Sequence, residues 1–159
     1  MNDFIACSDL HLRDDIPFCR KDDFFETMLL KLRFLVKQSN ETECGLFIAG
    51  DIFDHWKPSP WLLGQVISIF KKAKSITAVP GQHDLPSHNM DLYKRSGLYV
   101  LERAGVLTVK SNPLVSCVGW GMEDHSPCTP ILLIHKYVWM DSHFPDAGPA
   151  GNYKAVLKA

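Results

Sequence analysis

Three short apolar runs, each followed at once by acidic or histidine side chains, constrain the fold of this chain more than any other feature. The runs at residues 4–8, 46–49 and 75–79 are typical of buried β-strands. Between them, residues 21–38 and 61–72 carry apolar side chains at three- and four-residue steps, which predicts amphipathic helices. This strand–helix–strand–helix–strand order favours an α/β fold in which helices cover a parallel sheet.

The second half of the chain is less regular. Residues 93–103 predict a short helix, and residues 106–109, 115–118 and 131–134 predict further strands. The last of these strands ends at His135, so it delivers a polar residue in the same way as the first three. We therefore expect His135 to belong with the earlier polar signatures.

The end of the sequence combines a loop with the beginning of a helix. Residues 142–151 are rich in proline and glycine, which predicts a loop. Residues 152–158 predict an amphipathic helix that ends after about two turns without a glycine or proline stop. Because so short a helix is marginal by itself, we interpret this end as a truncation and expect one incomplete domain over residues 1–159.

Composition limits the class of protein. Hydrophobic residues make up 46% of the 159 residues and charged residues 22%, which is ordinary for one globular domain. The formal net charge of −1 gives no global indication of a nucleic-acid partner. Five cysteines without a Cys-x-x-Cys pair favour a reducing compartment over a disulfide framework. The sequence shows neither a signal peptide nor a transmembrane segment, so we expect a cytoplasmic protein without membrane contact.

The first two polar signatures are suited to binding metal ions. On an extended backbone, side chains at i and i+2 point the same way, so Asp9 and His11 could hold one divalent cation. Asp51 follows a glycine that allows a sharp turn at the sheet edge. Two cations about 3.5–4 Å apart repel each other, and Asp51 is the anionic ligand expected to bridge them. Asp54 is expected to orient its neighbours, and the alternative is an N-cap or turn residue.

The third signature combines an imidazole with a carboxylate and an amide. His83 is expected to act as general acid to the leaving oxygen or as hydrogen-bond donor to the developing charge, with Asp84 orienting it. The amide oxygen of Gln82 is a reasonable ligand for Mn²⁺ or Mg²⁺. His135 could supply an imidazole to a second metal ion, although a histidine at the end of an apolar strand also fits a packing role.

Together, the motifs Asp-x-His, Gly-Asp-x-x-Asp, Gly-Gln-His-Asp and a lone histidine resemble those of the calcineurin-like metallophosphoesterase family. The resemblance covers residues 4 to about 136. It implies an α/β fold, a β-sandwich flanked by helices, with two divalent metal ions, Mn²⁺ in the first place and Mg²⁺ as the alternative. It also implies a role for each residue. Asp9 and His11 would bind the first metal ion, Gln82 and His135 the second, and Asp51 would bridge the two. His83 would contact the substrate phosphate.

The chain departs from the family pattern at two places. Gln82 stands where the family usually has asparagine, and its extra methylene moves the amide oxygen by roughly one bond, whereas metal distances tolerate only about ±0.2 Å. No closing Gly-His-x-His pair follows His135, and His143 is the only later histidine. On the family scheme we therefore expect each metal to lack one ligand and the closing strands to be missing.

A finer resemblance concerns the substrate. The stretch GDIFD at residues 50–54, followed by KPS at 57–59, and GQHD at 81–84, followed by Pro86, resemble the exonuclease subunit of the bacterial SbcCD complex and phage repair and recombination nucleases. This implies a DNA substrate and a coiled-coil ATPase partner. Two alternatives stay open: a phosphatase or nucleotide phosphodiesterase, and a catalytically inactive fragment of the same fold.

Overall fold

A computed structural model describes residues 4–123 and 129–136 of the chain. Its centre is a three-stranded parallel sheet in which β2 lies between β1 and β3. One helix connects β1 to β2 and a second connects β2 to β3, so the predicted alternation is confirmed. The elements are β1 (Phe4–Cys7), α1 (Phe24–Glu41), β2 (Gly45–Ala49), α2 (Pro60–Phe70) and β3 (Ile76–Val79).

Both long helices begin at a residue that caps their first turn. The Asp23 carboxylate accepts a hydrogen bond from the backbone N–H of Glu26 at 3.2 Å, so α1 begins at Phe24 rather than at the predicted residue 21. The Ser59 hydroxyl accepts from the N–H of Leu62 at 3.1 Å, and a proline occupies the first position of α2. The caps therefore set the two boundaries that apolar periodicity alone misplaced.

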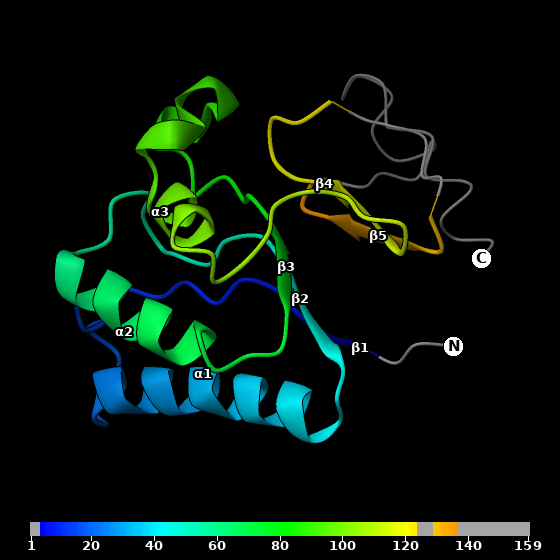
Figure 1. Ribbon diagram of the computed structural model, residues 1–159. Coiled ribbons are helices and arrows are strands. Elements are labelled where there is room, and N and C mark those ends of the chain that lie inside the picture. Colours follow the sequence, from blue (N-terminus) through cyan, green and yellow to red (C-terminus); the bar gives the residue numbers. More distant parts are fainter. Residues whose placement is uncertain (1–3, 124–128, 137–159) are drawn as a thin grey trace, which may run out of the picture.

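The central strand is buried on both faces, and its side chains alternate between two cores. Leu46 and Ile48 pack with the apolar faces of the helices, whereas Phe47 and Ala49 belong to a smaller cluster on the opposite face. Figure 1 shows the helices on one side of this sheet and a second small sheet on the other. A near-continuous apolar run is what a strand covered on both faces requires.

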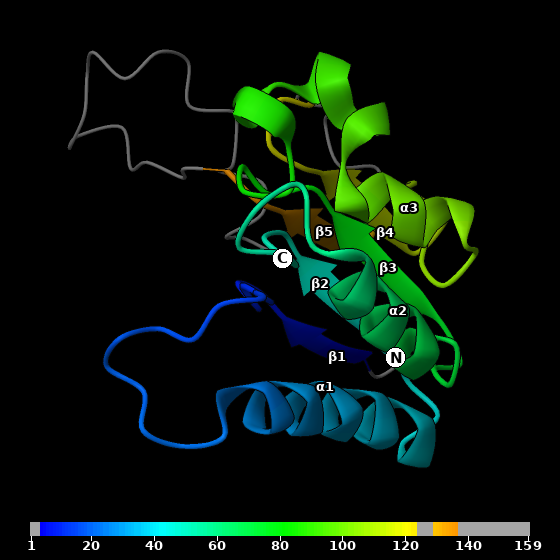
Figure 2. The ribbon, with the colours of Figure 1, turned by 90° about the vertical axis from the view of Figure 1, so that its left-hand side faces the viewer.

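The second sheet pairs β4 (Val115–Val118) with β5 (Ile131–Ile134) in parallel, within the predicted bounds. Side chains from both sheets form the cluster between them, which consists of Phe47, Val79, Val115, Cys117 and Leu133. Figure 2 shows the view turned by 90°, in which β4 and β5 again lie beside β3. The described residues thus form an α/β fold with two parallel sheets and helices over the outer face of the larger one.

Two sequence predictions were wrong in detail. Residues 106–109 do not form a strand, because only Thr108 pairs with β3: its N–H donates to Ile76 and its carbonyl accepts from Ala78, at 3.0 and 2.9 Å. The predicted helix at 93–103 divides at Ser96, whose extended backbone (φ −93°, ψ 158°) ends the 3₁₀ helix η2 (Met90–Arg95) and caps α3 (Gly97–Arg103).

Some predictions concern other parts of the chain. The loop at 142–151, the helix at 152–158 and His143 lie outside the described residues. Within the described ranges, no helix combines the length and apolar character needed to cross a lipid bilayer.

Candidate metal centre

The loops after β1 and β2 lie side by side at the carboxyl edge of the larger sheet. The backbone N–H of Asp9 donates to the carbonyl of Gly50 at 3.1 Å, and that of His11 donates to the carbonyl of Asp51 at 3.0 Å. A further parallel bridge joins Leu12 to Phe53. The pairing of the two strands therefore continues beyond their ends, which places the first two polar signatures next to each other.

The backbone at this edge is left-handed at Asp9 and His11, where the sequence predicted an extended conformation, and at Gly50 and Asp51, where it predicted a sharp turn. Asp9 has a φ of 53°, His11 of 42° and Asp51 of 50°, and Gly50 has a φ of 81°. The prediction that Asp9 and His11 extend from a regular strand was therefore wrong. Left-handed conformations cost non-glycine residues of order 1–3 kcal/mol each and persist only where surrounding structure enforces them. Here the two backbone hydrogen bonds to the β2 loop enforce them.

The carboxylate of Asp51 lies at the centre of the cluster. Its side chain is only 1% exposed. One oxygen, Oδ1, accepts from the backbone N–H of His83 at 2.9 Å, and the other, Oδ2, lies 3.9 Å from Nε2 of His11 and 3.5 Å from Nε2 of His135. A buried carboxylate between imidazoles is the position expected of a ligand shared by two cations.

Among the described residues, two groups of side chains place their ligand atoms within 4.8 Å of one another, and both contain Asp51. His11 and His83 complete the first group, and Asp9 and His135 complete the second. This division differs from the pairing of Asp9 with His11 that the resemblance implied, although Oδ1 of Asp9 also lies 3.9 Å from Nε2 of His11. Carboxylate and imidazole donors suit divalent first-row cations.

The geometry of His135 shows how such a cation would fit. Its Nδ1 donates to the carbonyl of Ala49 at 2.7 Å, and its Nε2 lies 2.8 Å from the amide oxygen of Gln82. The Asp51 carboxylate raises the pKa of His135 to about 9, so without a cation both ring nitrogens carry protons. A divalent ion would replace the Nε2 proton, while the bond to Ala49 keeps the ring oriented.

Opposing effects act on Asp51 itself. Burial alone would raise its pKa, but hydrogen bonds from His135 and from the backbone N–H of His83 outweigh burial, and its pKa is lowered. The carboxylate therefore stays ionised, which a metal ligand must be.

Asp84 does not have the predicted role of orienting His83. Its side chain is fully buried, and its two oxygens accept from the backbone N–H groups of Gly81, Ile52 and Phe53 at 3.0–3.2 Å. Burial raises the pKa of Asp84 to about 6. The physical reason for the correction is that a buried carboxylate must find donors, and the nearest are the backbone N–H groups of two loops. Asp84 thus joins the loop after β3 to the loop after β2.

The backbone of Asp54 orients His83 instead. Nδ1 of His83 lies 3.1 Å from the Asp54 carbonyl, which can only accept, so Nε2 is the nitrogen left for the cluster. The Asp54 carboxylate lies 3.1 Å from Nδ1 of His11 and 3.3 Å from a guanidinium nitrogen of Arg13. Asp54 thus contacts His83 through its backbone carbonyl, and the N-cap of the following helix is Ser59 rather than Asp54. Arg13 was missed, although it follows His11 by two residues.

A comparison with protein families identifies the family to which the chain belongs. The model of the calcineurin-like phosphoesterases matches residues 3–150. The chain belongs to the calcineurin-like phosphoesterase family. A search of curated proteins finds no match. Membership implies metal-dependent hydrolysis of phosphoesters, and the two His/Asp groups suit the divalent metal ions typical of the family.

Packing around the metal centre of this phosphoesterase leaves no space for a side chain at two glycines. A Cβ added to Gly81 would lie 2.0 Å from Oδ1 of Asp51, and one added to Gly50 would lie 2.3 Å from Nδ1 of His135. Separations under 3.0 Å are essentially never seen for real Cβ atoms. Both glycines therefore permit the close approach that the centre needs.

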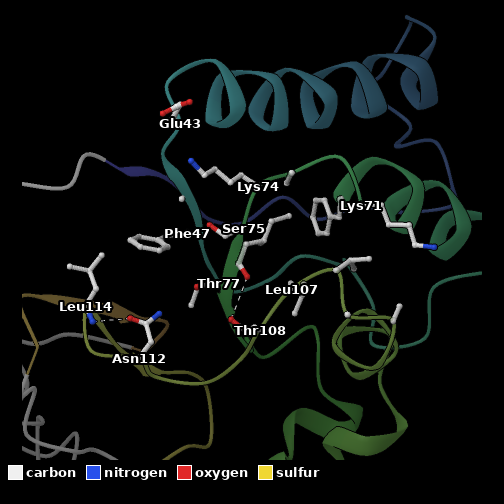
Figure 3. A pocket seen from close by; sticks show the side chains of 17 residues that line it. Glu43, Phe47, Lys71, Lys74, Ser75, Thr77, Leu107, Thr108, Asn112 and Leu114 are labelled. Carbon is white, nitrogen blue, oxygen red and sulfur yellow. Dashed lines mark hydrogen bonds between the residues drawn. The ribbon is translucent and has the colours of Figure 1, made fainter.

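A hollow larger than the two beside the metal centre lies elsewhere in the described part of the phosphoesterase. It has a volume of about 880 Å³ and lies at the amino edge of the larger sheet, where β2 and β3 begin. Figure 3 shows its lining, with Lys74 and Ser75 beside Phe47 and the segment around Thr108 and Asn112. Neither candidate metal group of the described residues includes a residue from this hollow.

Proposed function

We propose that this calcineurin-like phosphoesterase hydrolyses phosphodiester bonds in DNA, as a nuclease of the SbcCD type. The observation that carries the proposal is a pair of hollows that share Asp9. The first, of about 400 Å³, runs from Asp9 and His11 along α1. The second, of about 360 Å³, lies between Asp9 and His135. The candidate metal centre therefore adjoins two open spaces.

A diester fits two hollows better than a monoester does. A phosphodiester has an organic substituent on each side of the phosphorus, whereas a monoester has only one. The lining of the first hollow includes the cationic side chains of Arg13, Arg20 and Lys31 together with apolar side chains such as Phe24 and Leu32. The second is lined by Trp120 and Lys136. Cations and aromatic rings next to each other suit the phosphates and bases of a nucleic-acid strand.

The residues of the centre have two kinds of role: most would bind the metal ions, and His83 contacts the substrate. When bound, two divalent cations supply Lewis-acid stabilisation of the charge on the phosphoryl oxygens and activate a water molecule. Asp51 would hold both cations, and the ligands Asp9, His11, Gln82 and His135 would complete the set. His83 contacts the substrate phosphate. We propose Mn²⁺ as the natural metal, with Mg²⁺ as the alternative.

A partner subunit is part of the same proposal. The stretch at residues 50–59 resembles that of nuclease subunits that act with a coiled-coil ATPase. We therefore propose an ATPase of this kind as the partner. Stimulation of DNA cleavage by ATP only when such an ATPase is added would support it, and cleavage unaffected by the ATPase would contradict it.

The test of the substrate compares three phosphoesters in the presence of Mn²⁺. We expect faster hydrolysis of a bis-aryl phosphate than of a mono-aryl phosphate, and degradation of linear duplex DNA. A much faster monoester reaction would instead identify a phosphatase. Failure to retain Mn²⁺ after exhaustive exchange, together with no turnover, would identify an inactive relative.

A further inference from the structure

Left-handed backbone conformations mark the candidate metal centre, and they extend beyond it. Six described non-glycine residues have a positive φ: Asp9, His11, Glu43, Asp51, Ser87 and His88. Three of them belong to the metal groups. Glu43 lies near the amino edge, in the turn before β2. Ser87 and His88 remain, two consecutive strained residues that the proposed chemistry does not yet use.

Hydrogen bonds hold this pair in place. Ser87 has φ 50° and ψ 29°, and His88 has φ 56°. The backbone N–H of His88 donates to the carbonyl of Leu85 at 3.1 Å, and the indole N–H of Trp120 donates to the carbonyl of His88 at 3.2 Å. Two successive left-handed residues other than glycine are unfavourable in isolation. These contacts hold the backbone from which the His88 side chain extends.

That position continues a row of imidazoles. The rings of His11 and His83 have their centroids 5.0 Å apart, and those of His83 and His88 lie 6.1 Å apart. His88 is exposed and belongs to neither candidate metal group. The row thus leads from the metal centre to the surface of the protein.

We propose that His88 contacts the substrate directly, donating an imidazole N–H to a phosphate or leaving-group oxygen of the phosphodiester beyond His83. This inference rests on the proposed phosphodiesterase function. A neutral imidazole always carries one N–H, so the contact needs no change of protonation. The hydrogen-bonded backbone fixes the point from which the imidazole extends, and defined placement is what substrate-positioning groups require.

Two glycine variants test the proposal as a matched pair. Ser87→Gly and His88→Gly each place glycine at a left-handed position, which relieves strain, but only the second removes the imidazole. We expect both variants to melt at a higher temperature than the wild type. Ser87→Gly should keep the wild-type kcat/KM on a bis-aryl phosphate, whereas His88→Gly should lose about 10- to 100-fold, as for a hydrogen bond to a charged group.

Two further readouts separate substrate contact from a structural role. His88→Gly should bind inorganic phosphate about tenfold more weakly by calorimetry at unchanged Mn²⁺ content, and free imidazole should restore part of its activity. Unchanged kcat/KM and phosphate affinity in His88→Gly, or an equal loss in Ser87→Gly, would overturn the role of His88 while the diesterase function stands. Absence of diester hydrolysis by the wild type would overturn both proposals.

Discussion

The amino and carboxyl edges of the larger sheet differ in their buried charges and backbone conformations, and the volumes of their hollows do not show this difference. The amino edge has the larger hollow, about 880 Å³, but contributes to neither candidate metal group of the described residues. The carboxyl edge has hollows of about 400 and 360 Å³, yet it gathers the buried carboxylates Asp51 and Asp84 and most of the left-handed residues. Buried charge and backbone strain, rather than empty space, mark the site of chemistry in this fold.

The most direct way to break this comparison is to remove the shared ligand. Asp51→Asn keeps the shape of the side chain but removes the charge that both metal groups use, so kcat/KM on a bis-aryl phosphate should fall by more than about 100-fold. Bound Mn²⁺, measured by elemental analysis after dialysis, should fall in parallel. Lys74→Ala in the amino-edge hollow is the control and should change neither quantity. Full metal content in Asp51→Asn would contradict the shared-ligand role.

Glycines at opposite edges give a second contrast. In Gly81→Ala the new Cβ would lie 2.0 Å from Oδ1 of Asp51, so the loop must shift. We expect the free energy of unfolding to fall by about 1–3 kcal/mol and most of the activity to be lost. In Gly45→Ala the nearest atom is Ser75 Oγ at 3.4 Å, an ordinary contact. That variant should unfold within about 1 kcal/mol of the wild type in urea. Equal effects of the two variants would show that the edges are equally tolerant.

Buried hydrogen-bonding groups sharpen the comparison further. Asp84→Ala removes an acceptor from three backbone N–H groups, so the free energy of unfolding should fall by about 3 kcal/mol. At the amino edge, Ser39 is also buried, but its hydroxyl makes one bond, to the carbonyl of Cys44 at 2.6 Å. Ser39→Ala should therefore cost about 1 kcal/mol. Urea titrations compare the two, and a larger loss in Ser39→Ala would reverse the ranking.

The last prediction concerns the rate at which cysteine thiols react with an alkylating reagent. Burial raises the pKa of Cys7 and Cys117 to about 11, whereas Cys19 is exposed. About three pH units below its pKa, a thiol is roughly one part in a thousand thiolate. At pH 8 we therefore expect iodoacetamide to modify Cys19 well before Cys7 or the buried Cys44, as located by peptide mass mapping. Labelling of Cys7 as fast as Cys19 would mean that the carboxyl edge opens readily.

Much of the fold and of the metal centre could be predicted from the sequence, because a general rule of parallel sheets determines where the polar residues lie. The carboxyl ends of parallel strands meet at one edge, so the residues after the apolar runs had to converge. The meeting of Asp9 and His11 with Asp51 follows from that rule, whereas the strands at 115–118 and 131–134 were predicted from their apolar runs. Single-residue pairing at Thr108 does not, since it depends on how the segment meets β3 in space.

The details of the centre depend on tertiary contacts that no local pattern contains. The left-handed φ of Asp9 is imposed by a hydrogen bond to Gly50, about forty residues away in the chain. The role of Asp84 depends on its complete burial next to two loops. A Gly-Gln-His-Asp motif specifies the residue types but not which backbone groups they will meet.

One histidine has a consequence for folding as well as for chemistry. His135 follows β5 of the smaller sheet, yet it reaches across to the carbonyl of Ala49 and to Asp51 of the larger one. A cation shared by Asp51 and His135 would cross-link the two sheets, so loading with Mn²⁺ should slow amide hydrogen exchange in β5 more than in β1. The small sheet would then report, through its protection, whether the ion has been taken up.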